Sequence, residues 1–153
     1  MSDSLKDDSL EVLLRFGEEY WEEIRHIEGQ RATIANLVMI IASASVGLMS
    51  QRGFDASRSS LAVLVVLSGL YGIMTTAKLH ERYRFLQKRL DLFYDKIDQI
   101  VPQAEFNRLR MLAHDDHVKQ FPKLSRLPLY LLWLILHVVV MTIGIIFFII
   151  GVT

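Results

Sequence analysis

The sequence predicts an all-α integral membrane protein: a helical bundle of three transmembrane helices with a cytoplasmic helical hairpin. Three observations predict it. Three long runs carry no charge, amphipathic segments flank the first two runs, and charged residues are segregated into the stretches between them. The 153 residues are 52% hydrophobic and 22% charged. These averages therefore combine very apolar segments with very polar ones.

The uncharged runs cover residues 32–51, 59–77 and the stretch after Arg126, where only His137 can carry charge near neutral pH. A helix needs about 20 apolar residues to cross the hydrocarbon core. In lipid the backbone must bond within its own segment, so we expect helices. The alternative, a buried hairpin in a soluble bundle, fits poorly with the long apolar third run. We divide the chain into a cytoplasmic amphipathic helix (1–31), a two-span transmembrane hairpin (32–78), a cytoplasmic helical region (79–126) and a third transmembrane helix (127–153).

Lysine and arginine predict the orientation. The segment 78–126 holds most of the 17 in the chain, four lie in residues 1–31, and the short loop between the first two runs holds Arg52 and Arg58. Positive residues accumulate on the cytoplasmic side. We therefore expect residues 78–126 and the N-terminus in the cytoplasm and the C-terminus outside.

Two apolar stripes with coiled-coil spacing follow the helical period on the cytoplasmic side. The first is Leu10, Leu13, Gly17, Tyr20, Ile24, Ile27 and Arg31; the second is Leu79, Tyr83, Leu86, Leu90, Phe93, Ile97 and Ile100. The second stripe as far as Ile97 is a candidate coupling seam. The N-terminal segment 1–31 is net acidic, whereas the segment 78–126 is net basic. The stripes can pair as an antiparallel hairpin, or the second can pair with copies of itself as an oligomeric stalk. A further short helix is expected over 103–119.

Small or polar residues recur within the spans. The pore or helix-packing candidates are Asn36, Ser43, Gly47, Ser68, Gly72, Thr76 and His137. Small residues four apart allow close helix packing, and the same residues can line a water-filled path in an oligomer. An ionisable residue within a span indicates function, so His137 is a candidate gate, proton acceptor or pore ligand. The alternative is a structural role, with a hydrogen bond to Tyr71, Asn36 or Ser43.

Catalysis and metal binding have little support. The chain has no cysteine, so disulfides and thiolate chemistry are excluded. The sequence His114-Asp115-Asp116-His117 lacks further ligands elsewhere and reads as a solvated polar turn. Phosphate-binding loops and hydrolase motifs are absent. We expect no enzyme, no cofactor and no metal.

Charge also bears on partners. The formal net charge of zero gives no global field for nucleic acid. Basic residues of the cytoplasmic segment can contact a nucleotide or another anion, or can simply form a solvated face. They are Arg82, Arg84, Lys88, Arg89, Arg108 and Arg110.

One resemblance rests on two stretches of sequence. The stretch Glu28–Asn36, with Lys78, Glu81, Arg82, Tyr83, Arg84 and Phe85, is similar to short bacterial membrane proteins found among defence genes. The plan resembles the SLATT effectors, in which a helix precedes two spans and a cytoplasmic helix follows them. The resemblance covers about Tyr20 to Val101, and the third span departs from it.

That resemblance implies a homo-oligomer in the inner membrane that disrupts it during antiviral defence. It also implies a trigger from a cytoplasmic sensor protein or a nucleotide signal, and no catalytic residues. We therefore expect an oligomeric membrane effector that forms or gates a pore and contacts membrane lipids. The alternative is a non-conducting membrane anchor that docks a cytoplasmic partner through its helical hairpin.

Overall fold

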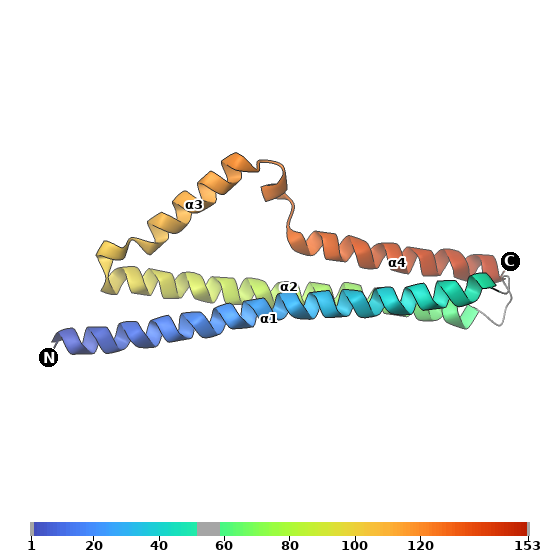
Figure 1. The fold of residues 1–153 in the computed structure, drawn as a ribbon, viewed down its shortest axis with the longest axis horizontal. Coiled ribbons are helices and arrows are strands. Elements are labelled where there is room, and N and C mark those ends of the chain that lie inside the picture. The colour runs from blue at the N-terminus through green and yellow to red at the C-terminus, as the bar shows by residue number, and fades with distance from the viewer. Residues whose placement is uncertain (1, 52–58, 153) are drawn as a thin grey trace. The chain divides into compact units, whose positions relative to one another are not determined.

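The computed structural model describes residues 2–51 and 59–152, and the described residues contain helices and no strand. The order is α1 (Ser2–Gln51), α2 (Ser59–Ile100), the 3-10 turn η2 (Pro102–Ala104), α3 (Phe106–Gln120), the 3-10 turn η3 (Leu124–Arg126) and α4 (Leu129–Val152) (Figure 1). The all-α prediction is confirmed. The loop with Arg52 and Arg58 lies outside the described residues.

The first two helices are longer than the segments drawn from the sequence. α1 runs without a break through position 31, and α2 runs through position 78. Gly17 and Gly29 are tolerated inside α1, since an interior glycine costs only about 1 kcal/mol. No proline precedes Pro102, and α2 ends just before it, as expected for a residue that cannot continue the backbone hydrogen bonds.

The short helix expected over 103–119 is shifted by the turn that precedes it. Gln103 lies in η2, and α3 begins only after Glu105, whose φ of 46° is in the left-handed region. A non-glycine residue there reverses the chain direction locally. The third apolar run begins its helix at Leu129, directly after Pro128.

The chain divides into two compact units. The first unit is Met1–Ile27 with Glu81–Pro128, and the second unit is Glu28–His80 with Leu129–Thr153. α1 and α2 contribute residues to both. The divisions fall near the positions where the sequence changes from charged to apolar.

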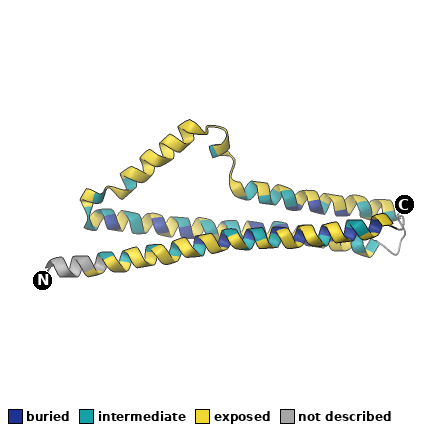
Figure 2. Ribbon diagram, in the orientation of Figure 1, coloured by how far each residue is buried: buried dark blue, intermediate teal, exposed yellow. Residues whose placement is uncertain are grey.

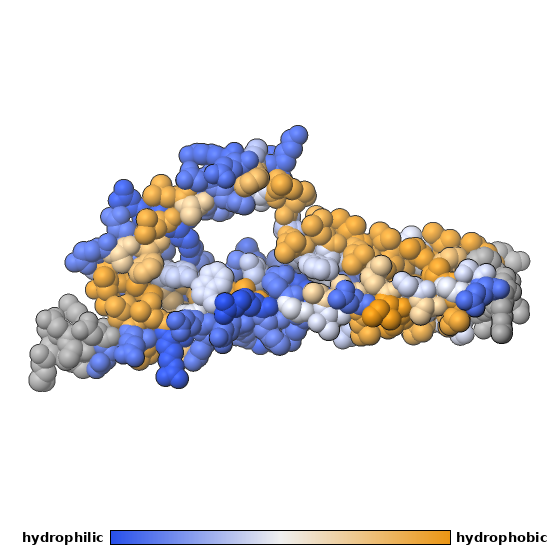
Figure 3. Space-filling view, in the orientation of Figure 1, coloured by the Kyte–Doolittle hydropathy of each residue, from blue (hydrophilic) through white to orange (hydrophobic). Residues whose placement is uncertain are grey.

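The second unit has a core built from three helices. Val38 and Ala42 of α1, Val65 of α2 and Val140 of α4 form one buried cluster, against which Ile34 packs. By length and composition, three helices can cross a membrane: Leu10–Gln51, Ser59–Ile100 and Leu129–Gly151 each contain a sufficiently apolar stretch. Hydrophobic side chains cover the visible face of α4 (Figure 3).

The first unit has a narrower core. Its buried residues lie on the facing stripes of α1 and α2: Ile24, Ile27, Leu86, Leu90 and Ile97. α3 has no buried residue and is exposed along its length (Figure 2). The two apolar stripes of the sequence thus form the core of this unit, and α3 lies outside that core.

Candidate functional site

Glycines bring α2 and α4 into close contact. A Cβ added at Gly69 would lie 2.7 Å from the Met141 backbone nitrogen, and one at Gly144 would lie 2.8 Å from Val66. At Gly72 the added atom would lie 2.3 Å from Nδ1 of His137. These distances exclude any side chain unless the neighbour moves, so the three glycines set the separation of the two helices.

The contacts between α2 and α4 follow an antiparallel register. Val66, Gly69 and Gly72 meet Gly144, Met141 and His137 in turn. Nearer the start of α4, the rings of Tyr130 and His80 stack with centroids 3.7 Å apart. The two helices therefore meet along most of the length of α4.

His137 is fully buried at this interface, with a relative exposure of 0%. Among the described residues, neither of its ring nitrogens has a hydrogen-bond partner. The partners expected from the sequence, Tyr71, Asn36 and Ser43, are all exposed, and none of them bonds to it. The expected hydrogen bond is therefore absent, because the ring packs against the backbone at Gly72 instead.

Three of the other candidates share this inner face. Ser68, Gly72 and Thr76 are buried on α2. The Ser68 hydroxyl donates to the carbonyl of Val65 at 2.9 Å, which satisfies it within its own helix. In the single chain these residues are therefore part of the packing between helices.

The remaining candidates face outward on α1. Asn36 and Ser43 are exposed, and a Cβ at Gly47 would meet nothing within 4 Å. Gly47 therefore does not bring α1 close to another helix of the same chain, contrary to the packing expectation. Thr33 and Ser50 lie on the same side at helical spacing and bond to carbonyls of their own helix, those of Gly29 and Gly47. We call Thr33, Asn36, Ser43, Gly47 and Ser50 the α1 polar face.

The α1 polar face lies on the side of the helix away from its buried positions, Ala35, Val38, Ala42 and Met49. No hydrogen-bond partner for the Asn36 amide is found in residues 2–51 and 59–152. Burying an unpaired amide in an apolar medium costs free energy. The Asn36 amide on this face therefore needs water or another molecule as its hydrogen-bond partner.

Sequence reasoning missed part of this arrangement. It placed Arg31 only on a stripe, whereas its side chain is 2% exposed and its Nη1 lies 2.6 Å from Glu28 Oε1. The signal was the i, i+3 spacing of the two charges at the edge of the apolar run. Gly144 was also missed, and Gly69, although it lies beside the small residues of the second span, was not among the candidates. Each is a glycine within an uncharged run, where a close helix contact is the usual reason for one.

The coupling seam lies along α2. Leu86, Leu90 and Ile97 are buried, whereas Leu79, Tyr83 and Phe93 are half-buried. In the first unit Phe93 contacts α1, with ring centroids 6.3 Å from Phe16 and 5.4 Å from Tyr20. The seam thus packs within the chain, as in the hairpin alternative; whether it also joins copies stays a prediction.

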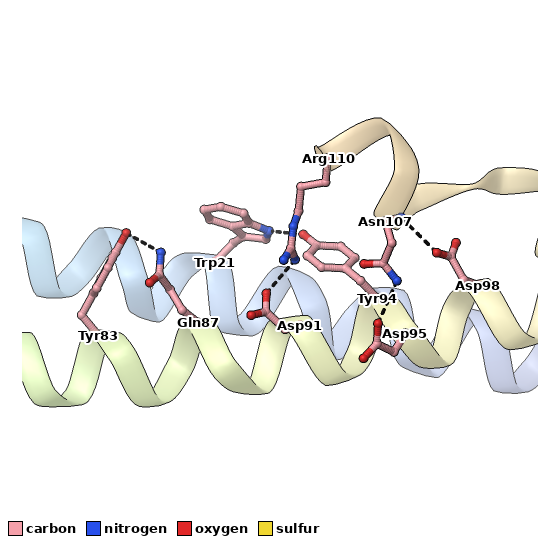
Figure 4. Close-up of polar contacts among 9 residues, drawn as sticks. All are labelled: Trp21, Tyr83, Gln87, Asp91, Tyr94, Asp95, Asp98, Asn107 and Arg110. Atoms are coloured by element: carbon pink, nitrogen blue, oxygen red, sulfur yellow. Dashed lines mark hydrogen bonds and ion pairs between the residues drawn. The ribbon is translucent and has the colours of Figure 1, made fainter. Parts of the chain in front are cut away.

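Three aspartates of α2 hold α3 (Figure 4). Asp98 accepts hydrogen bonds from the backbone N–H groups of Phe106 and Asn107, at 2.8 and 2.9 Å. Asp95 accepts from the Asn107 amide at 2.8 Å, and Asp91 lies 2.6 Å from Nη1 of Arg110. Asp98 thereby caps the α3 N-terminus, whose free N–H groups favour a carboxylate.

The basic residues divide by their contacts. Arg82, Arg108 and Arg110 form ion pairs with Glu23, Glu105 and Asp91. The Arg89 guanidinium lies 5.4 Å from the Tyr20 ring centroid and 4.9 Å from that of Phe85. Arg84 and Lys88 are exposed. The histidine and aspartate residues 114–117 are exposed but lie within α3, so the turn expected there is wrong. No group of three or more metal-ligand side chains occurs within the described ranges.

Comparisons with protein-family models, with curated proteins and with solved structures found no match to this chain.

Proposed function

We propose that this chain is an oligomeric membrane effector whose copies meet through the α1 polar face to form or gate a pore. The N-terminus and the first unit lie in the cytoplasm, and the C-terminus lies outside the inner membrane. The observation that supports this most directly is an exposed polar stripe on a helix that can cross a membrane. The exposed residues of α4 are almost all apolar, whereas those of α1 between positions 33 and 50 include polar residues as well as Leu37, Ile40 and Leu48.

The physical argument starts from the cost of that stripe. Asn36 and Ser43 would face lipid if the chain stayed alone, and a polar side chain in hydrocarbon lowers its free energy by finding a partner or water. A contact with a second copy supplies the partner, and a ring of copies supplies the water. One chain has too few spans to enclose a channel, so conduction requires several copies.

The inner residues take a different part in this proposal. Gly72 and His137 hold α2 against α4, and Ser68 and Thr76 are buried on α2. α4 presents apolar side chains to membrane lipids. Asn36, Ser43 and Gly47 line the contact or path between copies. The first unit receives the signal, from a cytoplasmic sensor protein or a nucleotide, and α1 and α2 carry it because each contributes to both units. The likeness to SLATT effectors makes antiviral defence the setting.

The test uses the absence of native cysteine. Single substitutions Asn36→Cys, Ser43→Cys and Gly47→Cys place one thiol on the α1 polar face. Leu67→Cys and Ile146→Cys place one on exposed apolar positions of α2 and α4. In liposomes we expect oxidative cross-linking between copies, or labelling by a water-soluble maleimide, for the first set only.

Ion flux from the same liposomes completes the test. Modification of a thiol on the α1 polar face should change flux, whereas modification at Leu67→Cys should not. Equal cross-linking and labelling of both sets would remove the α1 polar face from the mechanism. Persistent absence of flux with every candidate trigger would remove the pore.

One observation favours the anchor alternative. α3 exposes large apolar side chains on one side, Phe106, Leu109 and Leu112, as a surface that docks a protein partner does. In that case replacing these three residues with serine abolishes capture of the partner by the full chain, and no condition produces flux. The pore proposal instead expects flux to respond to the α1 polar face.

A further inference from the structure

The first unit contains a cavity of about 660 Å³ among α1, α2 and α3. Four aromatic residues line it, Trp21, Tyr83, Tyr94 and Phe106, together with the buried side chains of Ile24 and Leu90. A volume in this range and a mostly apolar, aromatic lining are typical of small-molecule sites.

The aromatic walls are held in place by contacts within the protein. Trp21 Nε1 donates to the Tyr94 hydroxyl at 3.0 Å, and the Gln87 amide donates to the Tyr83 hydroxyl at 2.8 Å (Figure 4). The Tyr94 and Phe106 ring centroids lie 6.4 Å apart with 25° between the planes. Rings ordered in advance offer a flat ligand stacking surfaces at low entropic cost.

A second, smaller cavity of about 420 Å³ adjoins the first. Both are lined by Gln87 and Asp91, and the second adds Arg84, Lys88 and Phe85. Arg84 and Lys88 are one helical turn apart on α2, both exposed, and no ion pair is recorded for either in the described part of the chain. They supply the positive charge that an anionic group needs.

The carboxylate of Asp91 does not oppose such an anion at full strength. It lies 2.6 Å from Nη1 of Arg110, so its charge is largely compensated. The Arg110 guanidinium in turn lies 5.4 Å from the Tyr94 ring centroid. The aromatic cavity is thus close to neutral, and the excess positive charge gathers in the second cavity.

We propose that the two cavities together bind a nucleotide. Its planar heteroaromatic base stacks among Trp21, Tyr94 and Phe106, and its phosphate binds Arg84 and Lys88. Gln87, shared by both cavities, offers an amide to the base edge or the sugar. This assigns a small-molecule signal to the proposed effector, yet the site exists in the first unit whether or not the spans conduct ions.

The experiment measures binding to the full chain in detergent micelles. The chain has two tryptophans, so Trp133→Phe leaves Trp21 in the cavity as the only indole. The probes are AMP, GMP, CMP and UMP, with adenosine, which lacks the phosphate, and ribose 5-phosphate, which lacks the base. We expect saturable quenching of Trp21 by at least one mononucleotide. Adenosine and ribose 5-phosphate should bind at least about tenfold more weakly, since each loses one set of contacts.

Variants separate the two parts of the site. The pair Arg84→Ala and Lys88→Ala should weaken mononucleotide binding about tenfold and leave adenosine unchanged, because only the phosphate contacts are lost. Phe106→Ala should weaken both ligands. Arg108→Ala is the control, because Arg108 is exposed, pairs with Glu105 and lines neither cavity. It should change neither affinity.

Two results would overturn the proposal: no saturable quenching by any mononucleotide, or binding that is indifferent to Arg84→Ala with Lys88→Ala. Both substitutions are at exposed positions, so the fold should persist, and circular dichroism checks it. Because the readout is binding, a failure here leaves the cross-linking and flux tests of the pore untouched. Absence of flux, in turn, leaves the nucleotide site standing.

Discussion

The two units hold their helices together by opposite means. In the first unit, long side chains span the space between helices: Phe93 reaches Phe16 and Tyr20, Trp21 reaches Tyr94, and charged residues pair around them. In the second unit the helices meet at positions that have no side chain. Gly69, Gly72 and Gly144 bring the backbones of α2 and α4 together.

The difference is the one expected between helix packing in water and helix packing in lipid. In water, aromatic burial and ion pairs gain from excluding solvent. In lipid, apolar side chains gain nothing by leaving one apolar medium for another, so close backbone packing remains as the main attraction. The first unit should therefore tolerate adjustment of its side chains, whereas the second should tolerate almost none at its glycines.

The largest effect is expected at Gly72. Replacing Gly72 with leucine forces atoms into the space of the His137 ring, and we expect the free energy of unfolding to fall by about 3 kcal/mol. Titration with a denaturing detergent, followed by circular dichroism at dilutions that keep the chain monomeric, measures it. Gly47→Leu is the control, since nothing lies within 4 Å there. Equal losses would show that close packing does not distinguish Gly72.

The next effect is expected in the first unit at Phe93. Phe93→Ala removes the ring that contacts Phe16 and Tyr20 and should cost about 2 kcal/mol, less than a fully buried phenylalanine. Hydrogen exchange of residues 10–27 should become faster. Leu92→Ala, at a neighbouring side chain that is 63% exposed, should leave exchange unchanged. Unchanged exchange in Phe93→Ala would mean that the seam does not hold α1.

A smaller, local effect is expected where α3 begins. Asp98→Ala removes the acceptor for two backbone N–H groups and should destabilise α3 by about 1 kcal/mol. Hydrogen exchange in the first turn of α3 reports it. Asp98→Asn should retain part of the cap, and Asp115→Ala, on the exposed part of α3, should have no effect. Loss of protection throughout the first unit would show instead that Asp98 acts beyond α3.

The smallest effect is expected at the pair of Glu23 and Arg82. Their side chains are 34% and 54% exposed, and an ion pair so open to water contributes about 0.5 kcal/mol or less. Glu23→Gln should therefore lower stability slightly, and added salt should remove the difference from the parent chain. Glu18→Gln is the control for a change in net charge alone. An effect that persists in high salt would assign Glu23 a role other than the ion pair.

Much of the fold could be predicted from periodicity. The three apolar helices follow from the length of the uncharged runs. Both stripes follow from spacing, because a residue every three or four positions marks one face of a helix. The continuity of α1 could not be predicted, since composition changes at Arg31 while the backbone does not. The bend at Glu105, which sets the direction of α3, depends on a positive φ angle that the sequence pattern does not predict.

The candidate site was harder to predict for a definite reason. A small residue in a span looks the same whether it meets a helix of its own chain or of another. Gly72 and Gly47 look alike in the sequence, yet a Cβ added at Gly72 would meet the His137 ring and one added at Gly47 would meet nothing within 4 Å. The cavity of the first unit could not be predicted either. It forms only because the hydrogen bond from the Asn107 N–H to Asp98, which lies on the other side of the turn, holds α3 in place.

The register between α2 and α4 also constrains how the gene can change. Each contact depends on a glycine meeting one large residue, and successive residues of a helix point about 100° apart. A single codon lost between His137 and Met141 would turn Met141 and Gly144 of α4 away from Gly69 and Val66 of α2, even if the hydropathy were unaltered. Exchanges of one apolar residue for another on the outer surface of α4 can accumulate, but insertions and deletions within the helix should be eliminated.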